Sequence, residues 1–262
     1  MNSVSEDECG YRINGFWGTS VLIRKPLSLR NIVVTSPSAN RRPVKSRDHR
    51  LAQRFAAWLN HCHITPNQIS LASMGFAAFA ALMLVTWRHA MSEAQWVLPL
   101  LAIVGIQGRL LCNLFDGMVA LEGGRSTPGG ELYNDMPDRA ADALLLVAAG
   151  YAAGEFWSVG IWIGWLAALL AVATAYVRVL GASMGAPMRF SGPMAKQHRM
   201  AVLSGACLLS VLEPYLWAKG IVLAIAVAVI AVGSALTIAR RTREIHAYCE
   251  SAAADRSGAH DV

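Results

Sequence analysis

The sequence predicts an all-α, polytopic membrane protein with six transmembrane helices preceded by an amphipathic juxtamembrane helix. Apolar residues make up 55% of its 262 residues and charged residues only 15%, whereas a soluble domain carries about 25% charged residues. Six apolar stretches come near the length of about 20 residues that crosses a bilayer. If the stretches cross the membrane one after another, the segments between them lie alternately on its two sides. Nearly all the lysines and arginines then fall in segments on the same side.

The segment before the first apolar stretch has two parts. Residues 1–45 are mixed in composition without a sustained period, so we expect a cytoplasmic tail of low order. In residues 46–61, Leu51, Phe55 and Trp58 recur at helical spacing with arginines on the other sides. This pattern is typical of a helix that lies on an anionic leaflet, although a surface helix packed on the rest of the protein would look the same.

The six apolar stretches follow this helix. They cover about residues 69–87, 95–119, 140–154, 157–182, 200–217 and 219–238. The third is short, and it spans a bilayer only if its helix begins with the polar residues near Asp138. Residues 46–240 therefore form the predicted membrane domain, and residues 241–262 form a cytoplasmic C-terminal tail.

The distribution of charge predicts the orientation. Of the 23 lysines and arginines, 20 lie in the segments 1–68, 120–139, 178–199 and 239–262, and only Arg88, Arg109 and Lys219 lie outside them. The positive-inside rule places both termini and the loops 120–139 and 183–199 in the cytoplasm. We therefore expect a bacterial-type inner-membrane protein whose net charge of +6 serves an anionic membrane surface and not nucleic acid.

Polar residues cluster at the cytoplasmic ends of the second and third stretches. Asn113 and Asp116 are three residues apart, Asp138 and Asp142 are four apart, and each pair shares one face of a helix. The loop between them is rich in glycine, so it can turn back and bring the two helices together. Three carboxylates and one amide oxygen would then converge.

Clustered carboxylates near a bilayer need a counter-charge. A divalent ion such as Mg²⁺ or Mn²⁺ supplies it, since hard ions prefer oxygen ligands. The alternative is a structural network in which the acids pair with Arg109, Arg125 and Arg139, and spacing alone does not decide between the two.

The pattern of these residues resembles the signature of the CDP-alcohol phosphotransferases, D-x2-D-G-x2-A-R-x8-G-x3-D-x3-D. This chain has Asp116-Gly117-x2-Ala120, then a loop, then Asp138-x3-Asp142. The resemblance covers about residues 46–240, because the family also has a juxtamembrane helix and six spans.

Three departures indicate a divergent subgroup. Asn113 stands where the family has its first aspartate, and Leu121 stands where it has an arginine. The loop is about four residues longer, with Asn134 where the signature has glycine. These changes leave the number of bound metal ions, one or two, open.

The resemblance implies roles for the acids. Asn113, Asp116, Asp138 and Asp142 would ligate Mg²⁺ or Mn²⁺. Asp138 and Asp142 would be the catalytic pair, with Asp142 as a metal ligand or as the general base for the attacking hydroxyl.

The resemblance also implies how the substrates are held. The nucleotide-binding residues would be Asp116, Gly117, Ala120, Thr65 and Asn67. The residues for phosphate or acceptor would be Arg189, Lys196 and Arg199, with Arg178 as a further candidate; positive-inside charge alone would also explain these basic residues.

The expected function is transfer of a substituted phosphate group from a CDP-alcohol, with CDP-diacylglycerol as first choice, to an acceptor hydroxyl with release of CMP. Two alternatives stay open: a family member that binds lipid or nucleotide without turnover, and a transporter with an intramembrane acidic site. Because family members are often dimers, the resemblance also leaves a homodimer open.

Overall fold

The structure is a computed structural model that describes residues 11–14, 20–23, 50–91, 94–122, 130–187 and 192–258. The chain divides into two compact units, Met1–Arg41 and Arg42–Val262. In the first unit, β1 (Tyr11–Asn14) pairs antiparallel with β2 (Ser20–Ile23). The sequence predicted no regular element before residue 46, so this short hairpin is a correction.

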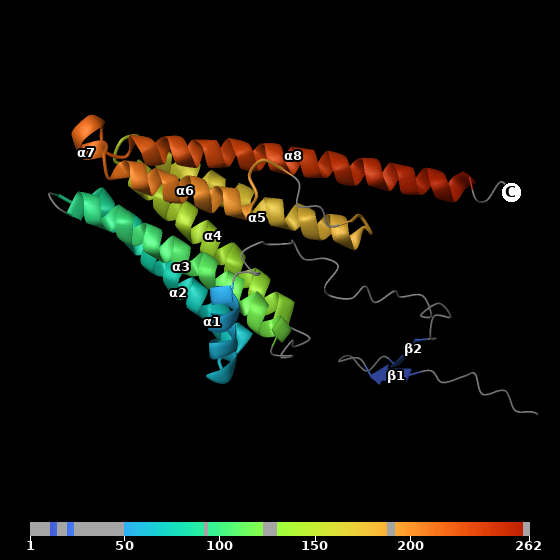
Figure 1. Ribbon diagram of the computed structural model, residues 1–262. Helices are drawn as coiled ribbons and strands as arrows, with labels where there is room; N and C mark the ends of the chain where they lie inside the picture. The colour runs from blue at the N-terminus through green and yellow to red at the C-terminus, as the bar shows by residue number, and fades with distance from the viewer. Residues whose placement is uncertain are drawn as a thin grey trace, which may run out of the picture. The chain divides into compact units, whose positions relative to one another are not determined.

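The described part of the second unit is helical (Figure 1). Its helices are α1 (Arg50–His61), α2 (Pro66–Arg88), α3 (Ala94–Glu122), α4 (Gly130–Ala153), α5 (Gly160–Ser183), α6 (Lys196–Ser210), α7 (Glu213–Leu216) and α8 (Ile221–Gly258). α2 packs on α3 and α4, α4 packs on α5, and α5 packs on α8. A core rich in alanine and leucine joins these helices.

Four helices in the described residues are long and apolar enough to cross a membrane: Pro66–Arg88, Ala94–Ala120, Gly160–Ser183 and Ile221–Ala254. A polytopic α-helical membrane protein is therefore confirmed. The predicted count of six spans is not supported, because α4 and α6 do not meet the same measure of length and composition.

α4 and α6, which cover two of the six predicted spans, differ from that prediction for physical reasons. α4 begins at Gly130, ten residues before the apolar stretch, so its first turns carry acidic and basic side chains. α6 has 15 residues and ends at Ser210. A new short helix, α7, begins at Glu213, and Pro214 fits its first turn because it has no N–H to donate there.

α1 packs against the end of α3, with Ala56 and Leu59 in a small apolar cluster. Leu51 and Trp58 remain exposed, whereas the partly exposed ring of Phe55 lies against Phe115 of α3, with ring centroids 4.7 Å apart. α1 is therefore packed on the protein along one face, and Leu51 and Trp58 are the large apolar side chains that the described residues leave mostly exposed.

Glycines let α4 and α5 approach closely. A Cβ atom added to Gly150 would lie 2.6 Å from the Cα of Gly164, and one added to Gly160 would lie 3.0 Å from the Cβ of Ala153. The Gly160-x3-Gly164 spacing is thus used inside the chain, as a close crossing of two helices.

α8 is 38 residues long and continues without a break past residue 240. At 1.5 Å per residue it measures about 57 Å, well beyond the hydrocarbon thickness of about 30 Å. Residues 241–258, which the sequence analysis assigned to a C-terminal tail, are an extension of this helix.

Candidate functional site

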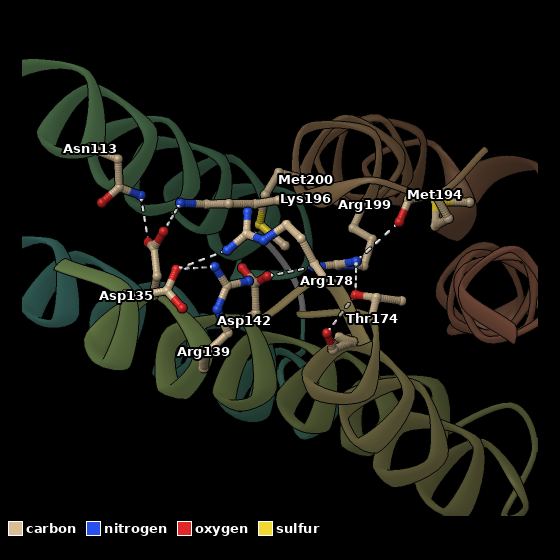
Figure 2. A network of polar contacts seen from close by, with 12 residues as sticks. Asn113, Asp135, Arg139, Asp142, Thr174, Arg178, Met194, Lys196, Arg199 and Met200 are labelled. Carbon is tan, nitrogen blue, oxygen red and sulfur yellow. Dashed lines mark hydrogen bonds and ion pairs between the residues drawn. The ribbon is translucent and has the colours of Figure 1, made fainter. Parts of the chain in front are cut away.

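Acidic residues of α4 meet basic residues of α3 and α6 toward one end of the helices (Figure 2). This is the end where α2, α4 and α6 begin and where α3 and α5 finish. Asp116, Asp138 and Asp142 are all buried, as are Arg109 and Arg199. The carboxylates are thus withdrawn from bulk water and depend on their neighbours for charge compensation.

Asp142 is held between two guanidinium groups. Arg109 donates from Nη2 to Oδ1 at 2.6 Å, and Arg199 donates from Nη2 to Oδ2 at 2.8 Å. Arg199 is itself positioned by the carbonyl oxygen of Met194 at 3.0 Å and by Thr174 Oγ1 at 3.4 Å. Each carboxylate oxygen of Asp142 therefore has its own cationic donor from a different helix.

Asp138 lies one turn earlier on α4 and has three polar neighbours. Its Oδ1 accepts from Asn113 Nδ2 at 2.9 Å and from Arg109 Nη2 at 3.3 Å. Its Oδ2 accepts from the ammonium group of Lys196. The amide of Asn113 is oriented here as a hydrogen-bond donor to a carboxylate.

Asp116 has a different environment. Its Oδ2 accepts from Ser70 Oγ at 3.0 Å, which ties α3 to the first turn of α2. Its Oδ1 is buried and has no hydrogen-bond partner. The carboxylate lies close enough to Asp138 and Lys196 for electrostatic interaction, so Asp116 faces the same site with one uncommitted oxygen.

The start of α2 is fixed by a capping box. Thr65 Oγ1 accepts from the backbone N–H of Gln68, and the Gln68 side chain accepts from the backbone N–H of Thr65. Thr65 is therefore the N-cap of α2. Through Ser70, this cap is linked to the turn of α3 that carries Asp116, followed by the buried Gly117.

Asp135 lies about one turn before Asp138 on α4. It pairs with Arg139 at 2.6 Å and with Arg178 of α5 at 3.3 Å. Partial burial opposes its ionisation, but the hydrogen bond and charge of Arg139, together with Arg178, outweigh this and lower the pKa of Asp135. Of the structural network considered as the alternative, the pairing of Arg109 with Asp138 and Asp142 is present, whereas Arg139 pairs with Asp135 instead.

Of the three predicted phosphate-binding residues, the structure describes two, Lys196 and Arg199. Lys196 and Arg199 lie one turn apart at the start of α6, with their charges directed to the acids of α4. Burial lowers the pKa of Lys196, although Asp138 acts in the opposite direction. Arg189, like Arg125 of the proposed structural network, lies outside the described residues.

A cavity of about 350 Å³ lies beside this network, between the end of α5 and the extension of α8. Arg178 and Arg241 line it together with Tyr248, Ile245 and Glu244. Arg241 is fixed by donating from Nη1 to the carbonyl oxygen of Thr174 at 2.7 Å. The cavity therefore combines two guanidinium groups with an apolar and aromatic wall.

Sequence reasoning did not assign Arg109, Ser70 or Arg241 to a substrate site. Arg109 carried a signal, since an ionisable residue inside a predicted span has a functional or pairing role by default. It is also one turn before Asn113 on α3. Ser70 and Arg241 gave no comparable signal, because their roles depend on which helices lie next to them.

The donor set fits part of a divalent-metal site. The unpartnered Oδ1 of Asp116 is a buried anionic oxygen of the kind that Mg²⁺ and Mn²⁺ bind. Both oxygens of Asp142 are already held by guanidinium groups, so Asp142 does not fit the role of ligand. Within the described residues, no group of three or more His, Cys, Asp or Glu side chains is arranged to hold a metal ion.

The fold and the site define a class of protein: a polytopic α-helical membrane protein with a buried charged site at one end of its helices. No protein-family model matches the chain. The inner membrane protein YnbA of Escherichia coli (strain K12) is 26% identical over 145 residues, which are 55% of this chain and 67% of YnbA.

Among solved structures, the phosphatidylinositol phosphate synthase PgsA1 of Mycobacterium tuberculosis has the same fold. With CDP-DAG bound it gives a TM-score of 0.60 at 14% identity, over 75% of this chain and 94% of PgsA1. In complex with manganese and citrate it gives 0.58 at 15% identity, over 74% and 88% of the two chains. The apo form also gives 0.58, at 14% identity over 73% and 94%.

Proposed function

We propose that this chain is a divergent CDP-alcohol phosphotransferase that transfers a substituted phosphate group from CDP-diacylglycerol to an acceptor hydroxyl and releases CMP. The observation that carries the proposal is the fold shared with PgsA1, solved with CDP-DAG bound, over nearly the whole of that enzyme. Of the acids on which the family resemblance rests, Asp138 and Asp142 share the guanidinium group of Arg109, and Asp116 is within electrostatic reach of Asp138.

The donor nucleotide would bind where α2 begins and α3 ends. Thr65 and Asn67 open α2, and Ser70 joins this turn to Asp116. Gly117 and Ala120 follow on α3, where small side chains leave the backbone open to close approach. The hydrogen bond between the two helices supports a single nucleotide subsite built from both.

A divalent cation would be held by Asp116, with Asp138 beside it. When bound, it neutralises negative charge on the donor pyrophosphate and stabilises the departing CMP. The side chain of Lys196 is 23% exposed, so its flexible stem allows it to leave Asp138 and contact a donor phosphate. Lys196, with Arg189 on the preceding segment, would then anchor the phosphate that is transferred.

Asp138 is the better candidate for the general base. Asp142 has a cationic donor on each oxygen, and a carboxylate so held has little tendency to take a proton. Movement of Lys196 would free Oδ2 of Asp138 for the acceptor hydroxyl. In this scheme Asp142 is a positioning residue that fixes Arg109 and Arg199.

The acceptor would occupy the cavity lined by Arg178 and Arg241. Two guanidinium groups favour a phosphorylated or otherwise anionic alcohol, because they bind phosphate oxygens through directed hydrogen bonds. The cavity adjoins the network, since Arg178 also pairs with Asp135 of α4. Glycerol phosphate and inositol phosphate are the acceptors to test first.

The proposed location is a bacterial inner membrane with the site on the cytoplasmic side. YnbA, a relative, is named an inner membrane protein. Lysines and arginines concentrate at the helix ends that carry the site, whereas Arg88 and Lys219 are at the other end. Both termini would then be cytoplasmic, and a homodimer is compatible with the uncovered apolar helix faces.

A direct test measures CMP release from CDP-diacylglycerol in nanodiscs with a panel of alcohols and alcohol phosphates, with Mg²⁺ or Mn²⁺. We expect release with at least one acceptor, reduced by at least about 100-fold in Asp138→Asn, as is usual when acid–base catalysis is removed. Glu250→Gln removes an exposed carboxylate of α8 and is the matched control. Nucleotide binding without CMP release from any donor would favour the alternative, a non-catalytic member that binds lipid or nucleotide.

A further inference from the structure

The charges of the site balance without an added ion. Three acidic residues, Asp116, Asp138 and Asp142, share the site with three basic residues, Arg109, Lys196 and Arg199. The first aspartate of the family signature is the neutral Asn113, which removes a fourth negative charge. The chain thus supplies in its own side chains the positive charge that clustered carboxylates need.

Arg109 lies where a shared cation was expected. Its Nη2 contacts Asp142 Oδ1 at 2.6 Å and Asp138 Oδ1 at 3.3 Å, and also the Asp138 carbonyl oxygen at 3.2 Å. The side chain is fully buried, with Nη1 directed to Met200 Sδ at 3.2 Å. A guanidinium group therefore bridges the two carboxylates of α4, and it leaves only Asp116 with an uncommitted oxygen.

We propose that Arg109 replaces one metal ion, and that the site binds a single divalent cation on Asp116. The second position, between Asp138 and Asp142, is filled permanently by the guanidinium group. One carboxylate is a sufficient protein ligand when the substrate contributes the remaining oxygens, because Mg²⁺ is commonly bound by one or two carboxylates, water and substrate phosphates. The ion therefore enters together with the pyrophosphate.

The test counts ions on the intact protein in nanodiscs that contain CDP-diacylglycerol and no acceptor. After equilibrium dialysis against Mn²⁺, bound manganese is measured by mass spectrometry and corrected with empty nanodiscs of the same lipid. We expect one ion per chain in the wild type and none in Asp116→Asn. The exposed-carboxylate variant Glu250→Gln should keep one ion.

The double variant Arg109→Gln, Asn113→Asp removes the guanidinium group and restores the family aspartate. We expect it to bind two ions per chain if it remains folded, as judged by gel filtration and circular dichroism. If it does not fold, the wild type and Asp116→Asn decide the matter. Two ions in the wild type, no ion in the wild type, or one ion that survives Asp116→Asn would each overturn the proposal.

This inference rests on the proposed function only for the choice of CDP-diacylglycerol as probe, and the two fail separately. CMP release from a protein that holds two ions would leave the function intact and remove the role given to Arg109. One ion on Asp116 without CMP release would leave the ion count intact and favour the non-catalytic alternative.

Discussion

Replacing Asp142 with asparagine tests the buried network most directly. Asparagine has nearly the same shape, so the variant removes charge without opening a cavity. Arg109 and Arg199 would both lose an anionic acceptor, and one of them would face an amide N–H₂ group in place of an oxygen. Both guanidinium groups are at most 1% exposed, so water cannot take over.

The expected loss is large. Removing one partner of a buried ion pair costs about 3–5 kcal/mol, and here one carboxylate serves two cations, so the upper end of about 5 kcal/mol applies. Since about 1.4 kcal/mol is a factor of ten, the folding equilibrium constant should fall by more than about 1000-fold. Asp135→Asn is the matched control, because that side chain is 44% exposed and its pairs should contribute at most about 1 kcal/mol.

Unfolding by dodecyl sulfate in mixed micelles, followed by tryptophan fluorescence, measures both variants against the wild type. The chain's eight tryptophans provide the signal. Circular dichroism before titration checks that each variant starts folded. If Asp142→Asn lost no more free energy of unfolding than Asp135→Asn, the claim that two guanidinium groups depend on Asp142 would be wrong.

Three further predictions concern other parts of the fold. Gly150→Ala should lower the free energy of unfolding by about 1–3 kcal/mol through overpacking, because the new Cβ meets a backbone atom of α5 at 2.6 Å; Gly205→Ala, where the Cβ meets nothing within 4 Å, should be neutral or stabilising in the same titration. Arg241→Gln should raise the KM for an anionic acceptor by about 10–100-fold through loss of a charge-assisted hydrogen bond, whereas Arg240→Gln, at the neighbouring exposed position, should not. If both variants changed the KM equally, the proposal that the acceptor binds in this cavity would be wrong. Burial raises the pKa of Glu213 above its ordinary value of 4.5, so its contribution to stability should be full below that value and decline as the pH rises through the folded-state pKa; a titration repeated across this range should show less decline in Glu213→Gln, and identical pH profiles would contradict it.

The sequence predicted the helices that consist of apolar residues throughout. It also predicted the amphipathic character of α1, because helical periodicity is a local property. It placed Asp138 and Asp142 on one face of a helix, which the structure bears out, since both contact the same guanidinium group of Arg109.

The remainder depends on contacts between segments far apart in the chain. Spacing could not tell whether a metal ion or Arg109 would balance Asp142, and it gave no reason to join Arg199 to that carboxylate from 57 residues away. Hydropathy missed the break between Ser210 and Glu213, because residues 200–217 are mostly apolar and Glu213 is the only charged residue among them. It also ended the last helix too early, since polar residues continue α8 without breaking it.

The unbroken extension of α8 has a consequence for how this protein could diversify. One wall of the cavity is a stretch of regular helix that begins beyond the apolar stretch of α8, where Arg241 and Tyr248 are two turns apart. Side chains on a regular helix can be exchanged without altering the path of the backbone. Selectivity for the proposed acceptor can therefore change by substitutions on this helix face alone, while the buried charges around Asp142 stay as they are.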